Sequence, residues 1–239
     1  MKNKLLQLFR DNVARPGNYA VRADGDEARI NIYEPIGGWF GIEAEQFAND
    51  LNAITAPVIH LHINSPGGDV FDGRAMATNI RQHPSKVIAH IDGLAASAAT
   101  YVALAANEVE IADGAFFMIH NAWTIALGNA ADMRDTAELL DKVDGSISAD
   151  YQRKTGAGAD QIADWMAAET WFTAAEALEH GFVDRIAEDA ESAPENASHW
   201  NLAAYANTPA ALVAPPKNEP QYDRARMERR LALLERTAA

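Results

Sequence analysis

Two side chains that could carry out nucleophilic chemistry each follow an apolar segment typical of a buried β-strand. Ser97 comes shortly after residues 87–91, which are short and β-branched, and His120 directly follows residues 116–119. A serine hydroxyl becomes a nucleophile when a neighbouring imidazole can accept its proton. If both segments are parallel strands, Ser97 and His120 can lie at the same carboxyl edge of a sheet, where sites commonly form. The pair therefore indicates attack on an acyl group.

Each of these residues also has a purely structural explanation. Residues 94–105 are small and lack Gly and Pro, so they are predicted to form a helix that begins near Ser97. Serine is a common N-cap residue in such a place. A histidine at the end of an apolar strand can equally be a core residue whose ring is hydrogen-bonded.

A glycine pair adds a possible anion-binding turn. Pro66-Gly67-Gly68 separates a predicted strand, residues 58–63, from a predicted helix, residues 69–81. Two glycines at such a turn let the backbone approach a ligand and direct N–H groups outward. Together with the helix start after Ser97, they could stabilise an oxyanion. An ordinary tight turn would have the same composition, and the chain has no nucleotide-binding glycine motif.

Four segments together resemble the ClpP family of serine peptidases, and more narrowly the ClpP-type head maturation (prohead) proteases of tailed phages. The matching segments are Ile63-Asn64-Ser65-Pro66-Gly67-Gly68, residues 93–99, Met118-Ile119-His120-Asn121 and residues 171–184. In this order they are specific as a set. The resemblance implies an α/β fold of the ClpP/crotonase-like type, a repeated β-β-α superhelix with a protruding long helix. It also implies a serine endopeptidase that needs no cofactor and no metal.

The resemblance assigns roles to named residues. Ser97 corresponds to the nucleophile and His120 to the general base. The backbone N–H groups of Gly67 or Gly68 and of Ala98 are expected to form the oxyanion hole, and by motif position Gly67 and Ala98 correspond to the family's donors.

The third member of the triad departs from the family pattern. The family has an Asp two residues before the aromatic residue of the last motif, and counting back from Trp171 gives Glu169. A glutamate offers the imidazole the same acceptor as an aspartate. Asp164, a little earlier, is the alternative.

A serine–lysine mechanism is a second possibility, because related signal-peptide peptidases use a lysine base. Lys142 is the candidate, but it stands between Asp141 and Asp144. Carboxylates favour the charged ammonium, which cannot accept a proton. His120 is therefore the preferred base.

The chain divides into three predicted parts: a lead-in segment, residues 1–27; a protease domain, residues 28–187; and an acidic, Pro-containing tail, residues 188–239, predicted to be poorly ordered. Residues 221–239 of the tail could form a basic amphipathic helix. Residues 130–155 are predicted to form the longest helix, ending at Gly156. Its apolar stripe fits either the protruding helix of the family or a core helix.

Composition narrows the possible partners. The chain has 239 residues, a net charge of −14, a pI near 4.8 and no cysteine. Such acidity argues against nucleic acid or an anionic membrane as the main partner, and the lack of cysteine excludes thiol catalysis. The resemblance implies protein or peptide substrates, a ring-forming homo-oligomer, and capsid or scaffold proteins as partners. The expected location is the cytoplasm of a bacterial host, with the interior of a phage prohead as the narrower expectation.

The preferred interpretation is an ATP-independent serine endopeptidase that processes scaffold or capsid proteins. The alternatives are a general ClpP-type subunit working with a partner ATPase, a crotonase-like acyl-CoA enzyme, and a non-catalytic ring scaffold.

Overall fold

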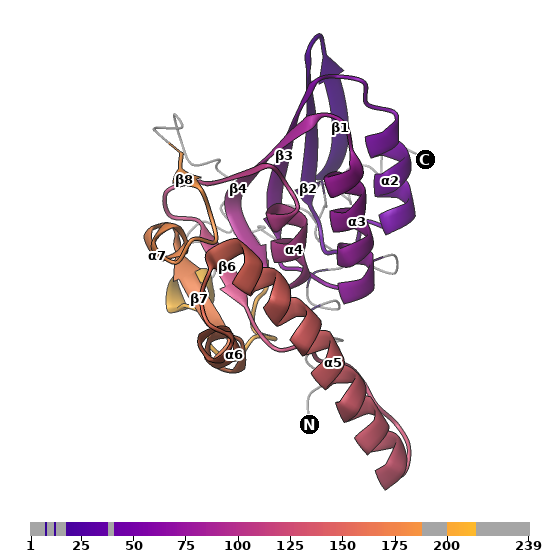
Figure 1. The fold of residues 1–239 in the computed structure, drawn as a ribbon, viewed down its shortest axis with the longest axis vertical. Helices are drawn as coiled ribbons and strands as arrows, with labels where there is room; N and C mark the ends of the chain where they lie inside the picture. Colours follow the sequence, from indigo (N-terminus) through magenta and orange to yellow (C-terminus); the bar gives the residue numbers. More distant parts are fainter. Residues whose placement is uncertain (1–7, 9–11, 13–17, 38–40, 188–199, 214–239) are drawn as a thin grey trace, which may run out of the picture.

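The computed structural model describes residue 8, residue 12 and residues 18–37, 41–187 and 200–213 (Figure 1). The strands are β1 Asn18–Asp24, β2 Glu27–Tyr33, β3 Val58–Ser65, β4 Lys86–Ala96, β5 Glu108–Ile111, β6 Phe116–Ile119, β7 Thr170–Thr173 and β8 Arg185–Ile186. The helices are α2 Ala44–Asn52, α3 Val70–Gln82, α4 Ala98–Leu104, α5 Ala130–Thr155, α6 Ala159–Ala167, α7 Ala174–Glu179 and α8 Ala210–Val213. The predicted α/β class is confirmed.

Strand β4 belongs to two parts of the sheet. The strand order is β1-β2-β3-β4-β5-β8, with β1 antiparallel to β2 and the others parallel. Residues 88–91 of β4 pair with β5, whereas residues 94–96 pair with β6, which in turn pairs antiparallel with β7. Because β4 and β6 are parallel neighbours, the residues that follow them emerge at the same edge.

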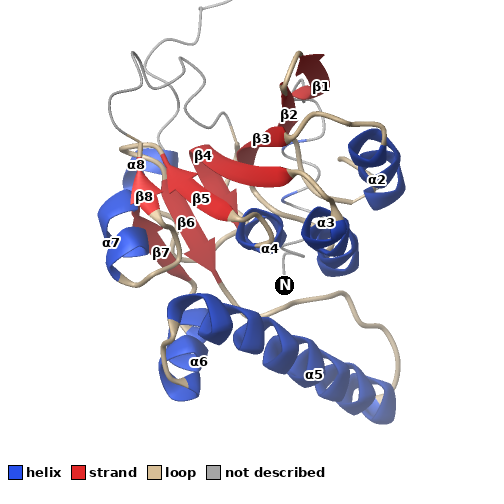
Figure 2. Cartoon of the chain, turned by 45° about the horizontal axis from the view of Figure 1, so that its top comes forward, coloured by secondary structure: helices blue, strands red, loops and turns tan. Residues whose placement is uncertain are grey.

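Alternating burial places the core on one side of the sheet. In β2 and β3 every second side chain is buried, including Ile30, Ile32, Ile59 and Leu61. Helices α2, α3 and α4 lie on this side (Figure 2). Asp69 caps α3, because its carboxylate accepts the N–H groups of Phe71 and Asp72.

Helix α5 confirms the predicted helix over residues 130–155, and it ends at Gly156, whose φ is 74°. Its C-terminal part is anchored: Ile147 and Tyr151 are buried, and the Tyr151 hydroxyl lies 2.7 Å from the Thr100 hydroxyl of α4. Its N-terminal part extends away from the body, and Leu139 is 52% exposed there (Figure 1). The helix is therefore the protruding one that the resemblance implied.

Three predictions about local structure differ from the structure. Residues 94–96 were expected to start a helix but continue β4, because their buried side chains and pairing with β6 outweigh helix propensity. Residues 18–24 of the expected lead-in form β1, since the Gly25 turn (φ 61°) lets them pair with β2. Residues 200–213 of the expected disordered tail are packed against the protein. The helix predicted over residues 221–239 lies outside the described residues.

The opposite face of the sheet carries a row of histidines. The His90 ring of β4 stacks with the rings of His60 and His62 of β3, at centroid distances of 5.1 and 4.6 Å. Nδ1 of His90 lies 3.1 Å from a Glu110 carboxylate oxygen, and Nδ1 of His62 lies 2.8 Å from Asp92.

This row makes the free energy of unfolding depend on pH. Burial and the charge of His62 lower the pKa of His90 below its usual 6.5, although Glu110 acts in the opposite direction. Burial by itself raises the pKa of Glu110, but hydrogen bonds from Arg185 and His90 outweigh burial and lower it. The folded protein therefore binds fewer protons than the unfolded chain at both groups, and stability falls on acidification.

We expect the urea midpoint to fall when the pH is lowered from 7 to 5, and to fall less in His90→Gln, which cannot titrate there. Urea unfolding at several pH values, followed by circular dichroism, measures this difference. If the urea midpoint depends on pH equally steeply in the wild type and in His90→Gln, the prediction is wrong.

Candidate active site

Ser97 occupies a sharp turn between β4, which ends at Ala96, and α4, which begins at Ala98. Its φ of 52° and ψ of −124° are unusual for a residue with a side chain. The backbone holds this conformation, because the Ser97 N–H donates to the Met118 carbonyl (2.9 Å) and the Ser97 carbonyl accepts the Thr100 N–H (2.9 Å). The side chain makes no helix-capping hydrogen bond, so the simple N-cap explanation does not hold.

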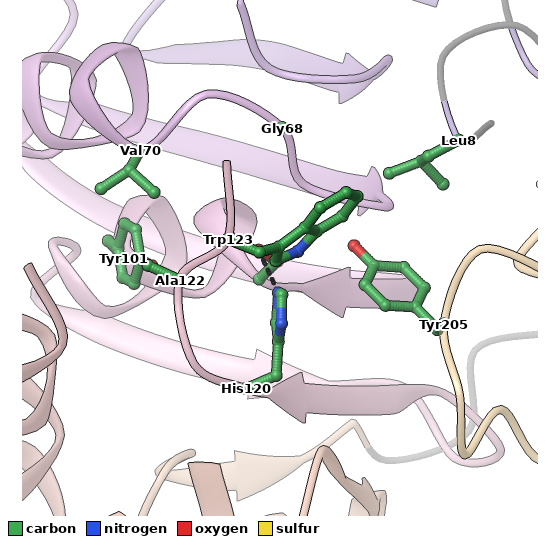
Figure 3. A pocket seen from close by; sticks show the side chains of 9 residues that line it. Leu8, Gly68, Val70, Tyr101, His120, Ala122, Trp123 and Tyr205 are labelled. Atoms are coloured by element: carbon green, nitrogen blue, oxygen red, sulfur yellow. Dashed lines mark hydrogen bonds between the residues drawn. The ribbon is translucent and has the colours of Figure 1, made fainter. Parts of the chain in front are cut away.

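The Ser97 hydroxyl is hydrogen-bonded to His120, with 2.8 Å between Oγ and Nε2. His120 lies just beyond β6 and reaches the serine because β4 and β6 are paired. Figure 3 shows its ring near Trp123 and Tyr205, whose ring centroids lie 6.3 and 5.5 Å away. A pocket beside this pair is also lined by Gly68 of the glycine turn and by Val70, the first residue of α3.

The two glycines of the turn lie differently. The Gly67 N–H donates to the Ser65 hydroxyl at 3.2 Å. Gly68 forms a parallel bridge with Ile36, in which the bonds are made by its neighbours: Gly67 O accepts the Ile36 N–H, and the Asp69 N–H donates to Ile36 O. The N–H of Gly68 therefore faces away from Ile36, and Gly68 lines the pocket.

Ala98 supplies a second amide close to this turn. As the first residue of α4, its N–H has no acceptor within the helix. A Cβ placed on Gly67 would lie only 2.9 Å from the Ala98 nitrogen, which shows how closely the turn approaches the helix start.

The register of β6 and β7 relates Glu169 to His120. The last residue pair of the antiparallel strands β6 and β7 is Ile119 with Thr170. Continuing this register by one residue brings His120 opposite Glu169. The Glu169 carboxylate accepts the N–H groups of Ala206 (3.0 Å) and Asn207 (2.7 Å).

Two residues of this site have strained backbone conformations. Among the residues that the structure describes, Ser97 and Glu169 are the non-glycine residues with positive φ, at 52° and 50°. Such conformations cost free energy and persist where the surroundings enforce them, often at functional sites.

The alternative residues lie in less suitable places. Asp164 is exposed on α6. Lys142 is exposed on α5, whereas a lysine base needs a desolvated position. Its neighbour Asp144 instead fixes the loop after His120, because its carboxylate accepts the Ala122 N–H at 2.6 Å.

Sequence reasoning missed Trp200 and Tyr205, which lie in the segment predicted to be disordered. Both are buried, and they hydrogen-bond to the end of β3 and to the glycine turn that follows it. Two aromatic residues and Leu202 within an otherwise acidic tail were the available signal.

Within the described part of the chain, no group of three or more His, Cys, Asp or Glu residues is arranged to hold a metal ion. None of the described helices has the length and apolar character needed to cross a membrane.

Comparison with known proteins agrees with this geometry. The family model described as Clp protease matches residues 43–190, more than half of the chain. ATP-dependent Clp protease proteolytic subunit 1 of Leifsonia xyli is 32% identical over 134 residues, covering 55% of this chain and 68% of the relative. Proteolytic subunit 2 of Treponema pallidum is 30% identical over 161 residues, covering 65% and 78%. The solved structure of a ClpP1 mutant from Listeria monocytogenes superposes with a TM-score of 0.59 at 25% identity, covering 67% of this chain and 91% of that one.

The fold and the site define a serine-type endopeptidase with a ClpP/crotonase-like α/β architecture. The chain belongs to the Clp protease family.

Proposed function

We propose that Ser97 and His120 hydrolyse peptide bonds in protein substrates, with Ser97 as nucleophile and His120 as general base. The observation that carries this proposal is the 2.8 Å contact between Ser97 Oγ and His120 Nε2 at a strained strand-to-helix turn. As Ser97 Oγ bonds to the scissile carbonyl carbon, its proton passes to His120 Nε2 and the carbonyl oxygen becomes an oxyanion. When the C–N bond breaks, His120 gives the proton to the leaving amine. A water molecule then attacks the acyl-serine, loses its proton to His120, and Ser97 recovers that proton.

The N–H groups of Gly68 and Ala98 are the proposed donors to the oxyanion. This choice differs from the motif-based preference for Gly67, because the Gly67 N–H already donates to Ser65 whereas Gly68 lines the pocket. Preorganised N–H groups stabilise the charge that develops only during the reaction.

Glu169 is the proposed orienting carboxylate. Its place next to His120 in the β6–β7 register supports this role, whereas Asp164 is exposed on α6. A carboxylate in this role fixes the imidazole tautomer and stabilises the imidazolium that forms during attack.

The nucleophile is tested by treating the protein with a fluorophosphonate and weighing it by mass spectrometry. We expect one adduct per chain, localised to Ser97, and no adduct in Ser97→Ala, whose peptidase activity should fall at least 10³-fold. Ser146→Ala, which changes an exposed serine of α5, is the matched control and should label like the wild type. Full labelling of Ser97→Ala would overturn the assignment, and full activity of that variant on an acyl-CoA would favour a crotonase-like enzyme. A wild type that stays unlabelled would favour a non-catalytic scaffold.

The resemblance supports a narrower proposal: an ATP-independent endopeptidase that forms rings in the bacterial cytoplasm and processes capsid or scaffold proteins during phage head maturation. The relatives described above are named as subunits of ATP-dependent Clp proteases, which supports the alternative of a subunit working with an ATPase. Degradation of a folded protein substrate by the purified chain, with and without ATP and a Clp ATPase, separates the two. Cleavage of a phage scaffold protein by the chain alone would support the narrower proposal.

A further inference from the structure

A segment beyond the family match is packed against the candidate active site. Residues 200–208, here called the flanking segment, follow residues 43–190, which match the Clp protease family. Its side chains Trp200, Leu202 and Tyr205 are 8%, 1% and 6% exposed. They form one apolar cluster with side chains of β4 and β6, namely Leu94, Ala96 and Met118. The segment therefore covers the same two strands that deliver Ser97 and His120.

The flanking segment bonds to the end of β3 and to the glycine turn through two side-chain donors. The Trp200 indole N–H donates to the Asn64 carbonyl at 3.1 Å, and the Tyr205 hydroxyl donates to the Pro66 carbonyl at 2.6 Å. The Pro66 carbonyl belongs to the peptide group that joins Pro66 to Gly67. A buried hydrogen bond to this group restricts rotation of the turn that presents the Gly68 N–H.

The same segment contacts both His120 and Glu169. The Tyr205 ring meets the His120 ring edge-on at 79°, and its hydroxyl points toward the site (Figure 3). Burial and the nearby Glu169 carboxylate raise the pKa of Tyr205, while a hydrogen bond with the Ser97 hydroxyl acts in the opposite direction. The next two residues, Ala206 and Asn207, donate their N–H groups to Glu169.

An asparagine pair anchors the start of the flanking segment. The Asn12 side chain, 3% exposed, accepts the Asn201 N–H at 2.7 Å and donates to the Asn201 carbonyl at 3.0 Å. This two-way hydrogen bonding imitates strand pairing and fixes the backbone between Trp200 and Leu202.

The flanking segment does not bind in the manner of a peptide substrate. An extended peptide substrate pairs backbone to backbone with a strand edge. Trp200 and Tyr205 instead reach backbone carbonyls with their side chains, and a pocket remains beside Ser97, with Tyr205 as one wall.

We propose that Tyr205 is a positioning residue of the active site, which acts by fixing the Pro66–Gly68 turn and the His120 ring. This inference rests on the proposed roles of Ser97, His120 and the glycine turn. A turn that can rotate places the oxyanion donor poorly, and small misplacements of reacting groups lower the rate steeply.

Tyr205→Phe tests this proposal, because it keeps the ring and removes only the hydroxyl, which donates to Pro66 and also contacts the Ser97 hydroxyl. We expect kcat for a short fluorogenic peptide to fall about tenfold, with KM within about twofold, and the rate of fluorophosphonate labelling of Ser97 to fall by a similar factor. Tyr19→Phe is the matched control: it removes a hydroxyl that donates to Asp50 at 2.9 Å, away from the site, and should leave kcat unchanged. Melting temperatures of both variants identify any loss of folding.

A kcat of Tyr205→Phe equal to that of the wild type overturns the proposal, and a higher kcat shows instead that the segment inhibits the site. If Tyr205→Phe does not fold, Trp200→Phe, which loses the donor to Asn64 together with part of the buried ring, is judged by the same criteria. A wild type that fluorophosphonate does not label contradicts the proposed function. A labelled wild type with an equally reactive Tyr205→Phe contradicts this inference alone.

Discussion

Replacing His120 by alanine is expected to lower kcat for peptide hydrolysis about 10⁴-fold or more, the scale on which a serine peptidase loses activity without its base. The reason is the 2.8 Å contact between Nε2 and Ser97 Oγ: without it, no group takes the serine proton as the acyl bond forms. His120 is half-buried at the end of β6, so its removal should cost far less in stability than in activity.

Lys142→Ala is the matched control, because Lys142 is the rival base and is exposed on α5. Its kcat should stay within about twofold of the wild type. The measurement is steady-state cleavage of a fluorogenic peptide, together with the rate of fluorophosphonate labelling of Ser97. If His120→Ala cleaves normally and Lys142→Ala does not, the base has been assigned to the wrong residue.

Gly67→Ala is expected to lower kcat by about 10²- to 10³-fold, comparable with the loss of an oxyanion donor. A Cβ at this position would lie 2.5 Å from the Ala96 carbonyl oxygen and 2.7 Å from the Ser97 Cβ. The turn must therefore move away from the nucleophile, and the adjoining amides leave their positions. An alanine held at the φ of 83° is strained in the folded state, which should lower the free energy of unfolding by about 1–3 kcal/mol.

Gly114→Ala is the matched control, because it introduces a similar backbone strain without forcing a neighbouring segment to move. Gly114 has almost the same φ, 80°, but a Cβ there would have no neighbour within 4 Å. This variant should lose about 1 kcal/mol of stability in urea unfolding and keep its kcat. Equal activity of the two variants would mean that the close approach of Gly67 to Ser97 has no part in catalysis.

Much of the fold follows from local signals in the sequence. The Asp69 cap and the Gly156 terminus set the ends of α3 and α5, and the capping box of Thr173 and Glu176 starts α7. These interactions join residues close together in the chain, which is why the pattern predicts them. Residues 94–96 were mispredicted because their strand conformation depends on pairing with residues 116–118.

The site divides in the same way. Nearness of Ser97 and His120 could be expected because both follow strands, and parallel strands end at one edge. Which of the two glycine N–H groups faces the site could not be predicted from the sequence, because it depends on the Gly67 N–H donating to Ser65 and on the bridge between Gly68 and Ile36.

By itself, the sequence determined the α/β class, the long helix α5 and the pairing of a serine with a histidine, because capping residues, glycine ends and strand periodicity are encoded in short stretches. Only the tertiary structure placed Trp200 and Tyr205 at the glycine turn, because their contacts with Asn64 and Pro66 join parts of the chain far apart in sequence. The burial that holds such contacts depends on the whole fold, and a local pattern carries no record of it.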